Sequence, residues 1–311
     1  MFSQSQSFAF KNFDTTLVSR SFLLRASLKI PQGKTNLPCV IFLNGSGPAD
    51  KDGTVGPNKI ALDILNGLAA NGIASISFDK RTVQHANQIV KNYDSFTVQN
   101  EYVEDALSAI EFVKNIKVID KKRVFLIGHS EGAIIAPYIY AQAKKSIKAI
   151  VLLAASPRNF EDLILSQFQY LLSLDSNNQM IQKQYSMIQH SAQNLPKVYE
   201  GKYVPKDSLP FGLPSKYWQS LKETSITKYL PLVKCPILIL QGKRDYQVTT
   251  NDFENLLLIT TKQQKVESAI LDSLNHLFMP GTGKSTPLEY SIPSHVSPKV
   301  IEKVTAFIRE N

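Results

Sequence analysis

Short runs of apolar residues recur along the chain, separated by segments with helical periodicity. The runs are 39–43, 73–78, 124–127, 149–154 and 236–240. Because their apolar residues are nearly continuous rather than alternating, they predict strands buried on both faces of a sheet. Helices are predicted between or after these strands at 60–68, 103–113, 133–143 and 300–308. Strands that alternate with helices imply right-handed crossovers, so we expect an α/β fold with a mostly parallel central sheet and helices on both faces.

Two parts of the chain depart from this rhythm. Between Phe8 and Ile30 apolar and polar residues alternate loosely, which predicts antiparallel edge strands at the N-terminus. Residues 157–230 are rich in Gln and Ser, and an insertion of this length is more typical of a lid than of a loop. We therefore predict a helical cap at 157–230, inserted into a core formed by 1–156 and 231–311.

Composition and charge narrow the class of protein. Of the 311 residues, 43% are hydrophobic and 20% are charged, which is typical of a globular chain. The net charge of +9 raises the question of a nucleic-acid partner. The basic residues are spread along the chain without a stripe of interleaved aromatics, so we interpret the charge as solubility and expect no nucleic acid.

The cysteine content and the N-terminal residues indicate in which cellular compartment the protein is expected. Cys39 and Cys235 each lie beside an apolar run, which is typical of small buried side chains, and two cysteines are too few for a disulfide framework. No Cys and His spacing suggests a metal site. A secretory signal pattern and an uninterrupted stretch of about 18 apolar residues are both lacking. We expect a cytoplasmic protein with no membrane span, and the sequence does not indicate its oligomeric state.

The segment Gly128-His129-Ser130-Glu131-Gly132 matches the pattern G-x-S-x-G. A predicted strand precedes it and a predicted helix follows it, which is the context that this motif requires. Glycines permit the sharp turn, and the turn projects the serine hydroxyl into a cleft at a helix N-terminus. The motif predicts that Ser130 is a nucleophile.

A serine hydroxyl needs a base, and the base needs a carboxylate that orients it. Hydrolases with this motif carry the acid and then the histidine later in the chain, each on a loop after a strand. Asp245 follows the run 236–240, and His276 follows the short apolar run 269–271, so we predict Asp245 as the acid and His276 as the base.

Other candidates for these roles have weaker positions. Asp252 and Asp272 are rivals for the acid, at a helix start and a strand end, and His295 follows a proline-rich stretch with no strand before it. His129 lies inside the motif, where we expect its side chain to point away from the reacting position and to serve packing or hydrogen bonding.

A nucleophilic serine also needs an oxyanion hole, which consists of two backbone N–H groups directed at the charge that develops on the substrate oxygen. We predict that the residue after the nucleophile, Glu131, supplies one of them. The loop 44–48 after the first buried strand supplies the other, with the Ser46 N–H as our first choice and that of Gly47 as the second.

The segments 44–53, 128–132, 240–248 and 274–278 together resemble those of the α/β-hydrolase superfamily. More narrowly, the chain resembles bacterial esterases and hydrolases of the serine-aminopeptidase-like branch, which is related to dienelactone hydrolases. Asn44 stands where many relatives have histidine, and Thr82 follows Asp79-Lys80-Arg81 where a glycine is frequent. The resemblance implies an α/β-hydrolase fold and a catalytic triad, and it assigns no role to Lys80, Arg81 or His295.

These observations predict a serine hydrolase that cleaves carboxylic esters of small molecules through an acyl-enzyme, without a metal or an organic cofactor. An acyl thioesterase, an acyltransferase or an aminopeptidase could use the same triad. An aminopeptidase would place carboxylates in the cap, where Glu161 and Asp162 are candidates, although both are equally typical of a solvated helix start. A protein that only binds its ligand would usually have lost a triad residue. The cap aromatics that could line the substrate site, or simply pack within the cap, are Phe168, Tyr185, Tyr217 and Trp218.

Overall fold

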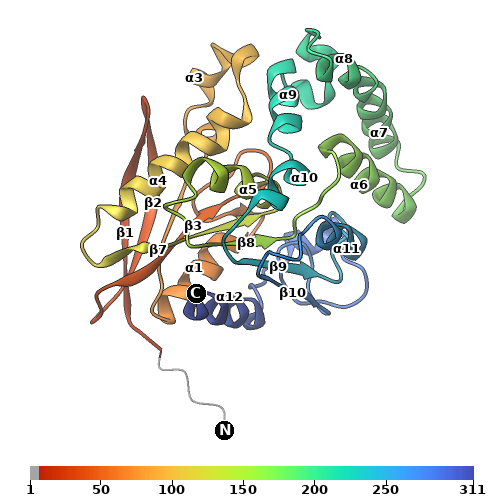
Figure 1. The fold of residues 1–311 in the computed structure, drawn as a ribbon. Coiled ribbons are helices and arrows are strands. Elements are labelled where there is room, and N and C mark those ends of the chain that lie inside the picture. Colours follow the sequence, from red (N-terminus) through yellow and green to blue (C-terminus); the bar gives the residue numbers. More distant parts are fainter. Residues whose placement is uncertain (1–6) are drawn as a thin grey trace.

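The computed structural model describes residues 7–311 and is built around an eight-stranded sheet in the order β1-β2-β6-β3-β7-β8-β9-β10 (Figure 1). The strands are β1 (Phe10–Ser19), β2 (Phe22–Pro31), β3 (Leu37–Leu43), β6 (Ala74–Phe78), β7 (Ile119–His129), β8 (Ala149–Leu153), β9 (Ile237–Gly242) and β10 (Val266–Leu271). β1 and β2 pair antiparallel, as do β2 and β6, and the other neighbours are parallel. The predicted parallel sheet with an antiparallel N-terminal edge is confirmed. A separate two-stranded hairpin consists of β4 (Thr54–Val55) and β5 (Asn58–Lys59).

Helices cover both faces of the sheet. They are α1 (Ile60–Ala70) and α12 (Pro298–Glu310) on one face, and α4 (Glu104–Lys114), α5 (Glu131–Ala143) and α11 (Thr250–Leu258) on the other. Side chains alternate between the two faces along each strand. In β7, Phe125 and Ile127 pack with α1 and α12, whereas Leu126 packs with α4 and α5. Both faces are therefore dry, which explains why the strand sequences are apolar without alternation.

Shorter elements follow β6. These are α2 (Arg81–Gln84) and α3 (Ala86–Val90), and a π-helical turn at Gln99–Val103 then leads into α4. Glu101 and Tyr102 in this turn are buried.

The chain between β8 and β9 forms a group of helices at the upper right of Figure 1. They are α6 (Phe160–Leu174), α7 (Gln179–Ala192), α8 (Leu195–Tyr199), α9 (Ser215–Glu223) and α10 (Ile226–Tyr229). Trp218 is the centre of a small core within this group. Ile226 and Leu230 instead belong to the large core beneath α5, so the last part of the segment packs on the sheet domain. The boundaries 157–230 stay a prediction.

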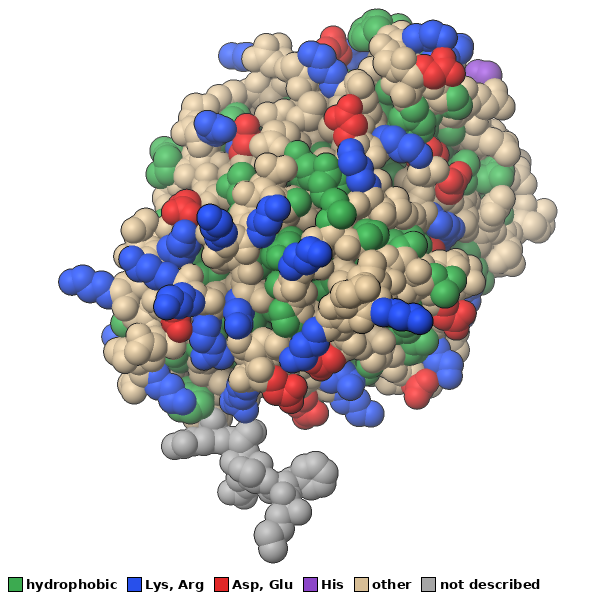
Figure 2. All heavy atoms as spheres, in the orientation of Figure 1, with side chains coloured by type: hydrophobic (Ala, Val, Ile, Leu, Met, Phe, Trp, Pro, Cys, Tyr) green, Lys and Arg blue, Asp and Glu red, His purple; other side chains and the backbone are tan. Residues whose placement is uncertain are grey.

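Charged side chains are numerous on the face shown in Figure 2. Lys and Arg are denser over its lower part than over its upper part, and some Asp and Glu lie among them. Within residues 7–311, no helix has the length and apolar character needed to cross a membrane. The same residues contain no cluster of three or more His, Cys, Asp or Glu side chains placed to hold a metal ion.

Candidate active site

Ser130 occupies the sharp turn between β7 and α5. Its backbone lies at φ 54° and ψ −120°, a conformation that is strained for a residue with a side chain. The Ser130 N–H donates to the Leu153 carbonyl oxygen at 2.9 Å, which ties the turn to the end of β8. The side chain is left partly exposed.

The flanking glycines allow backbone segments to touch. A Cβ atom on Gly128 would lie 2.4 Å from the Gly132 oxygen, and one on Gly132 would lie 2.5 Å from the Leu43 oxygen. Any side chain at either position would push α5 away from β7 or β3. The glycines therefore hold the helix N-terminus directly behind Ser130.

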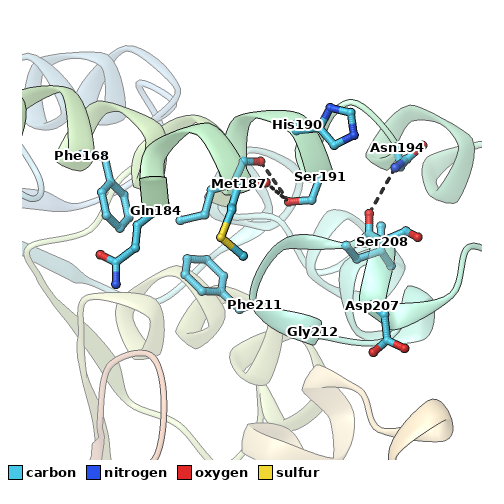
Figure 3. Close-up of a pocket in the computed structure, with 12 residues that line it drawn as sticks. Phe168, Gln184, Met187, His190, Ser191, Asn194, Asp207, Ser208, Phe211 and Gly212 are labelled. Carbon is cyan, nitrogen blue, oxygen red and sulfur yellow. Dashed lines mark hydrogen bonds between the residues drawn. The ribbon is translucent and has the colours of Figure 1, made fainter. Parts of the chain in front are cut away.

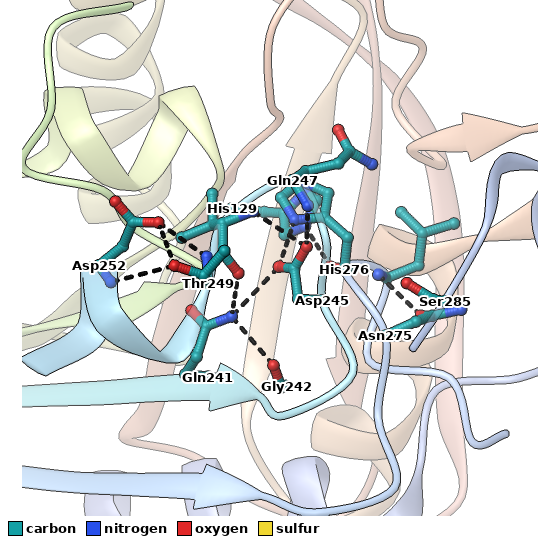
Figure 4. Close-up of polar contacts among 12 residues, drawn as sticks. His129, Gln241, Gly242, Asp245, Gln247, Thr249, Asp252, Asn275, His276 and Ser285 are labelled. Atoms are coloured by element: carbon teal, nitrogen blue, oxygen red, sulfur yellow. Dashed lines mark hydrogen bonds and ion pairs between the residues drawn. The ribbon is translucent and has the colours of Figure 1, made fainter. Parts of the chain in front are cut away.

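His276 and Asp245 form a buried pair. The distance from His276 Nδ1 to Asp245 Oδ2 is 2.7 Å. Asp245 also accepts hydrogen bonds from the Gln247 and Val248 N–H groups, at 2.8 and 3.0 Å, and from Gln241 Nε2 at 3.2 Å. Figure 4 shows the Asp245 carboxylate between Gln241 and His276. With Nδ1 directed at the carboxylate, Nε2 is the ring nitrogen left to exchange a proton with a ligand.

Ser130, His276 and Ser46 line a common cavity of about 190 Å³. The Ser130 hydroxyl makes no hydrogen bond to another residue of the described chain, so it shares this cavity with His276 without a direct bond. The hydrogen bond between a catalytic serine and its histidine is often long in a ligand-free enzyme and shortens when substrate binds.

The rival residues are engaged elsewhere. Asp252 caps α11 together with Thr249, and it accepts from Arg158 Nε at 2.6 Å. Burial alone would raise the pKa of Asp252, but the hydrogen bonds from Arg158 and Thr249 outweigh burial and lower it. Asp272 is exposed and pairs with Lys243. The exposed His295 pairs with Asp63 at 3.1 Å.

His129 packs against the proposed base. Its Nε2 lies 2.9 Å from the His276 carbonyl oxygen, and the two ring centroids are 4.8 Å apart. Burial, followed by the nearby His276, lowers the pKa of His129 to about 3, so this imidazole is neutral at physiological pH. The packing and hydrogen-bonding role that we expected is present. His129 is also one of the residues that line the cavity with Ser130 and His276, and the direction of its side chain relative to the reacting position stays a prediction.

The candidate oxyanion donors come from two elements. Glu131 is the first residue of α5, so its N–H has no partner within the helix. Ser46 is exposed, and its N–H makes no hydrogen bond among residues 7–311. The Asn44 side-chain amide donates a hydrogen bond to the backbone carbonyl oxygen of Asp50 at 2.9 Å, which stabilises the loop that contains Ser46.

Ser46 and Glu131 also line a second, mostly apolar cavity of about 410 Å³. The segment between β8 and β9 contributes apolar and aromatic residues to it, namely Phe160, Ile164, Phe211, Leu213 and Tyr217. Of the aromatics singled out in the sequence, Tyr217 lines this cavity, whereas Trp218 is fully buried in the core between α8 and α9.

The remaining two aromatics lie elsewhere. Phe168 lines a separate cavity of about 650 Å³ beside Met187 and Phe211 (Figure 3). The Tyr185 hydroxyl accepts hydrogen bonds from Gln169 and Gln189. Glu161 accepts from the Tyr199 hydroxyl at 2.9 Å, and Asp162 accepts from Asn159 at 3.3 Å, so both carboxylates have local partners.

A buried polar network beside the second cavity was missed in the sequence. Lys80 Nζ lies 2.7 Å from Glu101 Oε1, and the Tyr217 hydroxyl bonds to both Glu101 and Glu131. Burial, and next the charge of Glu101, raise the pKa of Glu131 to about 7. The available signal was Lys80 itself, a charged residue that stands two positions after the fully buried strand β6. Its neighbour Arg81 is also buried and pairs with Asp105 at 2.6 Å.

Comparison with known proteins places the chain in a family. The serine aminopeptidase S33 family matches residues 59–280. Esterase EstD of Thermotoga maritima is 34% identical over 287 residues, which are 92% of this chain and 65% of that protein. The chain thus spans just under two thirds of the length of this relative.

Solved structures share the fold at low identity. Est1E of Butyrivibrio proteoclasticus, solved with ferulic acid bound, superposes with a TM-score of 0.58 at 16% identity, over 95% of this chain and 98% of that one. Dienelactone hydrolase of Anabaena variabilis gives a TM-score of 0.57 at 14% identity, over 97% and 98% of the two chains. The resemblance inferred from the sequence is confirmed: the chain has the α/β-hydrolase fold and belongs to the serine aminopeptidase S33 family.

Proposed function

We propose that this protein is a serine hydrolase that cleaves carboxylic esters of small molecules through an acyl-enzyme. One observation carries the proposal: Ser130 and His276 line the same cavity, and the Nδ1 of His276 is hydrogen-bonded to the buried Asp245. A nucleophile, a base and an orienting carboxylate in this relation form a catalytic triad.

The reaction follows from these positions. Ser130 Oγ attacks the ester carbonyl carbon while His276 Nε2 takes the hydroxyl proton, and Asp245 stabilises the resulting imidazolium. The Ser46 and Glu131 N–H groups bind the oxyanion. His276 then protonates the departing alcohol, and the same imidazole later activates a water that releases the acid from Ser130.

Three observations support a carboxylic ester as the substrate. The apolar cavity next to Ser46 suits a hydrocarbon acyl group, and the Thermotoga relative is named as an esterase. Glu161 and Asp162 have local partners, which weakens the case for recognition of a substrate ammonium group. The cytoplasmic setting stays a prediction that rests on the two unpaired cysteines.

The test compares p-nitrophenyl esters, an acyl-coenzyme A thioester and an aminoacyl p-nitroanilide as substrates of the wild-type protein. Ester turnover should exceed the other two, and Ser130→Ala should abolish both turnover and labelling by a fluorophosphonate. Ser176→Ala, at an exposed position in a loop, is the matched control and should behave as wild type. Full activity in Ser130→Ala would overturn the proposal, and faster cleavage of the thioester or the anilide would reassign the substrate bond.

A further inference from the structure

The carbonyl of Gly45 is held by two buried donors. Lys80 Nζ donates to it at 3.1 Å, and the Tyr102 hydroxyl donates to it at 2.7 Å. Lys80 also contacts Glu101 Oε1 at 2.7 Å and the Tyr102 oxygen at 2.8 Å, so each of its three ammonium hydrogens has an acceptor. The side chains of Lys80 and Glu101 are 4% and 5% exposed, and such a desolvated ion pair strongly favours one geometry.

The same peptide group lies against the nucleophile. A Cβ atom on Gly45 would be 3.2 Å from the Ser130 Cβ, which is closer than ordinary packing allows. Ser46, the next residue, lines the cavity that holds Ser130 and His276.

Peptide geometry links these two facts. The C=O and N–H of a trans peptide point in opposite directions in one plane. Two donors on the Gly45 oxygen therefore fix the Ser46 N–H so that it points away from Lys80 and Tyr102. A carbonyl that accepts a charged donor is also polarised, which makes the N–H of the same peptide a stronger donor.

We propose that Lys80 and Tyr102 are positioning residues for the oxyanion hole, acting through the Gly45 carbonyl to direct the Ser46 N–H. This inference rests on the proposed function, because it needs an oxyanion at Ser130. It assigns a role to Lys80, for which the sequence alone gave none.

The test uses Tyr102→Phe, which removes only the hydroxyl. The matched control is Tyr140→Phe on α5, since Tyr140 is also buried and its hydroxyl also accepts a hydrogen bond, from the Lys234 N–H at 3.3 Å. Urea unfolding of both variants should show a single cooperative transition, so that a loss of activity is separated from a loss of the fold. Activity should separate them, because Tyr140 takes no part in the network.

For Tyr102→Phe we expect kcat on p-nitrophenyl butyrate to fall by about tenfold, with KM within about twofold. This is less than the 10²–10³-fold loss when an oxyanion donor is removed outright. The affinity for a trifluoromethyl ketone, which forms a tetrahedral adduct, should fall by a similar factor, whereas Tyr140→Phe should leave both values unchanged.

A kcat within twofold of wild type in Tyr102→Phe would overturn the inference, as would a loss of kcat without a matching loss of ketone affinity. Failure of the proposed function is distinguishable, because the wild-type protein would then neither hydrolyse the ester nor react with the fluorophosphonate.

Discussion

His276 Nδ1 lies 2.7 Å from Asp245 Oδ2, although 31 residues separate the two along the chain. The reason is the pairing of β9 with β10. These neighbouring strands run parallel, so the loops after them leave the same edge of the sheet. The loop after β9 carries Asp245, and the loop after β10 carries His276.

Asp245→Asn should lower kcat for a p-nitrophenyl ester by about 10³–10⁴-fold, because an amide facing Nδ1 favours the wrong imidazole tautomer. Steady-state kinetics on the purified variant is the measurement. Asp272→Asn, at an exposed carboxylate that only pairs with Lys243, is the control and should match wild type. A loss smaller than tenfold in Asp245→Asn would remove Asp245 from the proposed triad.

Gly132→Ala should destabilise the fold by about 3 kcal/mol or more, because its methyl group would lie 2.5 Å from backbone oxygens of β3 and the loop after it. Urea unfolding gives the free energy. Gly201→Ala is the comparison, since Gly201 has φ +83° but open space around it, so it should lose only about 1 kcal/mol from backbone strain. Equal losses in the two variants would contradict the close approach of α5 to β3.

The Glu131 carboxyl should make stability depend on pH. Tyr102 has one hydroxyl hydrogen but two acceptors, the Gly45 oxygen at 2.7 Å and Glu131 Oε2 at 2.9 Å, so a proton on Glu131 supplies the missing hydrogen. Burial raises the pKa of Glu131 from 4.5 to about 7. The folded state thus keeps this proton to a higher pH than the unfolded chain, and the free energy of unfolding should decrease as pH rises through this window, by about 1.4 kcal/mol per pH unit at most.

Urea unfolding at pH 5 and pH 8 checks this effect of Glu131. Glutamine cannot titrate, so Glu131→Gln should lose clearly less stability than wild type between the two pH values. The same loss in both proteins would mean that Glu131 does not hold a proton in the folded state.

Filling the apolar cavity with a larger side chain should shift the substrate preference toward esters with shorter acyl chains. Ile164→Trp should lower kcat/KM for p-nitrophenyl octanoate by about tenfold while changing the acetate by less than threefold, since Ile164 lines the 410 Å³ cavity. Met180→Trp, at a position 71% exposed on α7, is the control. An unchanged ratio of octanoate to acetate would show that the acyl chain binds elsewhere.

Local pattern was enough to predict the elements of the core. The apolar runs at 39–43 and 149–154 became β3 and β8, because a strand buried on both faces can carry few polar side chains. The motif around Ser130 was equally readable, since its glycines, strand and helix are contiguous in the chain. Asp245 and His276 could be selected because the order of strands and loops limits which residues reach one edge of the sheet.

The amino-acid sequence by itself therefore determined the strands, the main helices and the turn at Ser130, because these depend on neighbouring residues. Only the tertiary structure decided that Tyr217 lines a cavity while Trp218 is buried beside it, that His129 packs on His276, and that Lys80 bonds to the Gly45 carbonyl. These contacts join segments that are distant in the chain. No local periodicity encodes them, because they arise only when the strand order and the helix packing bring those segments together.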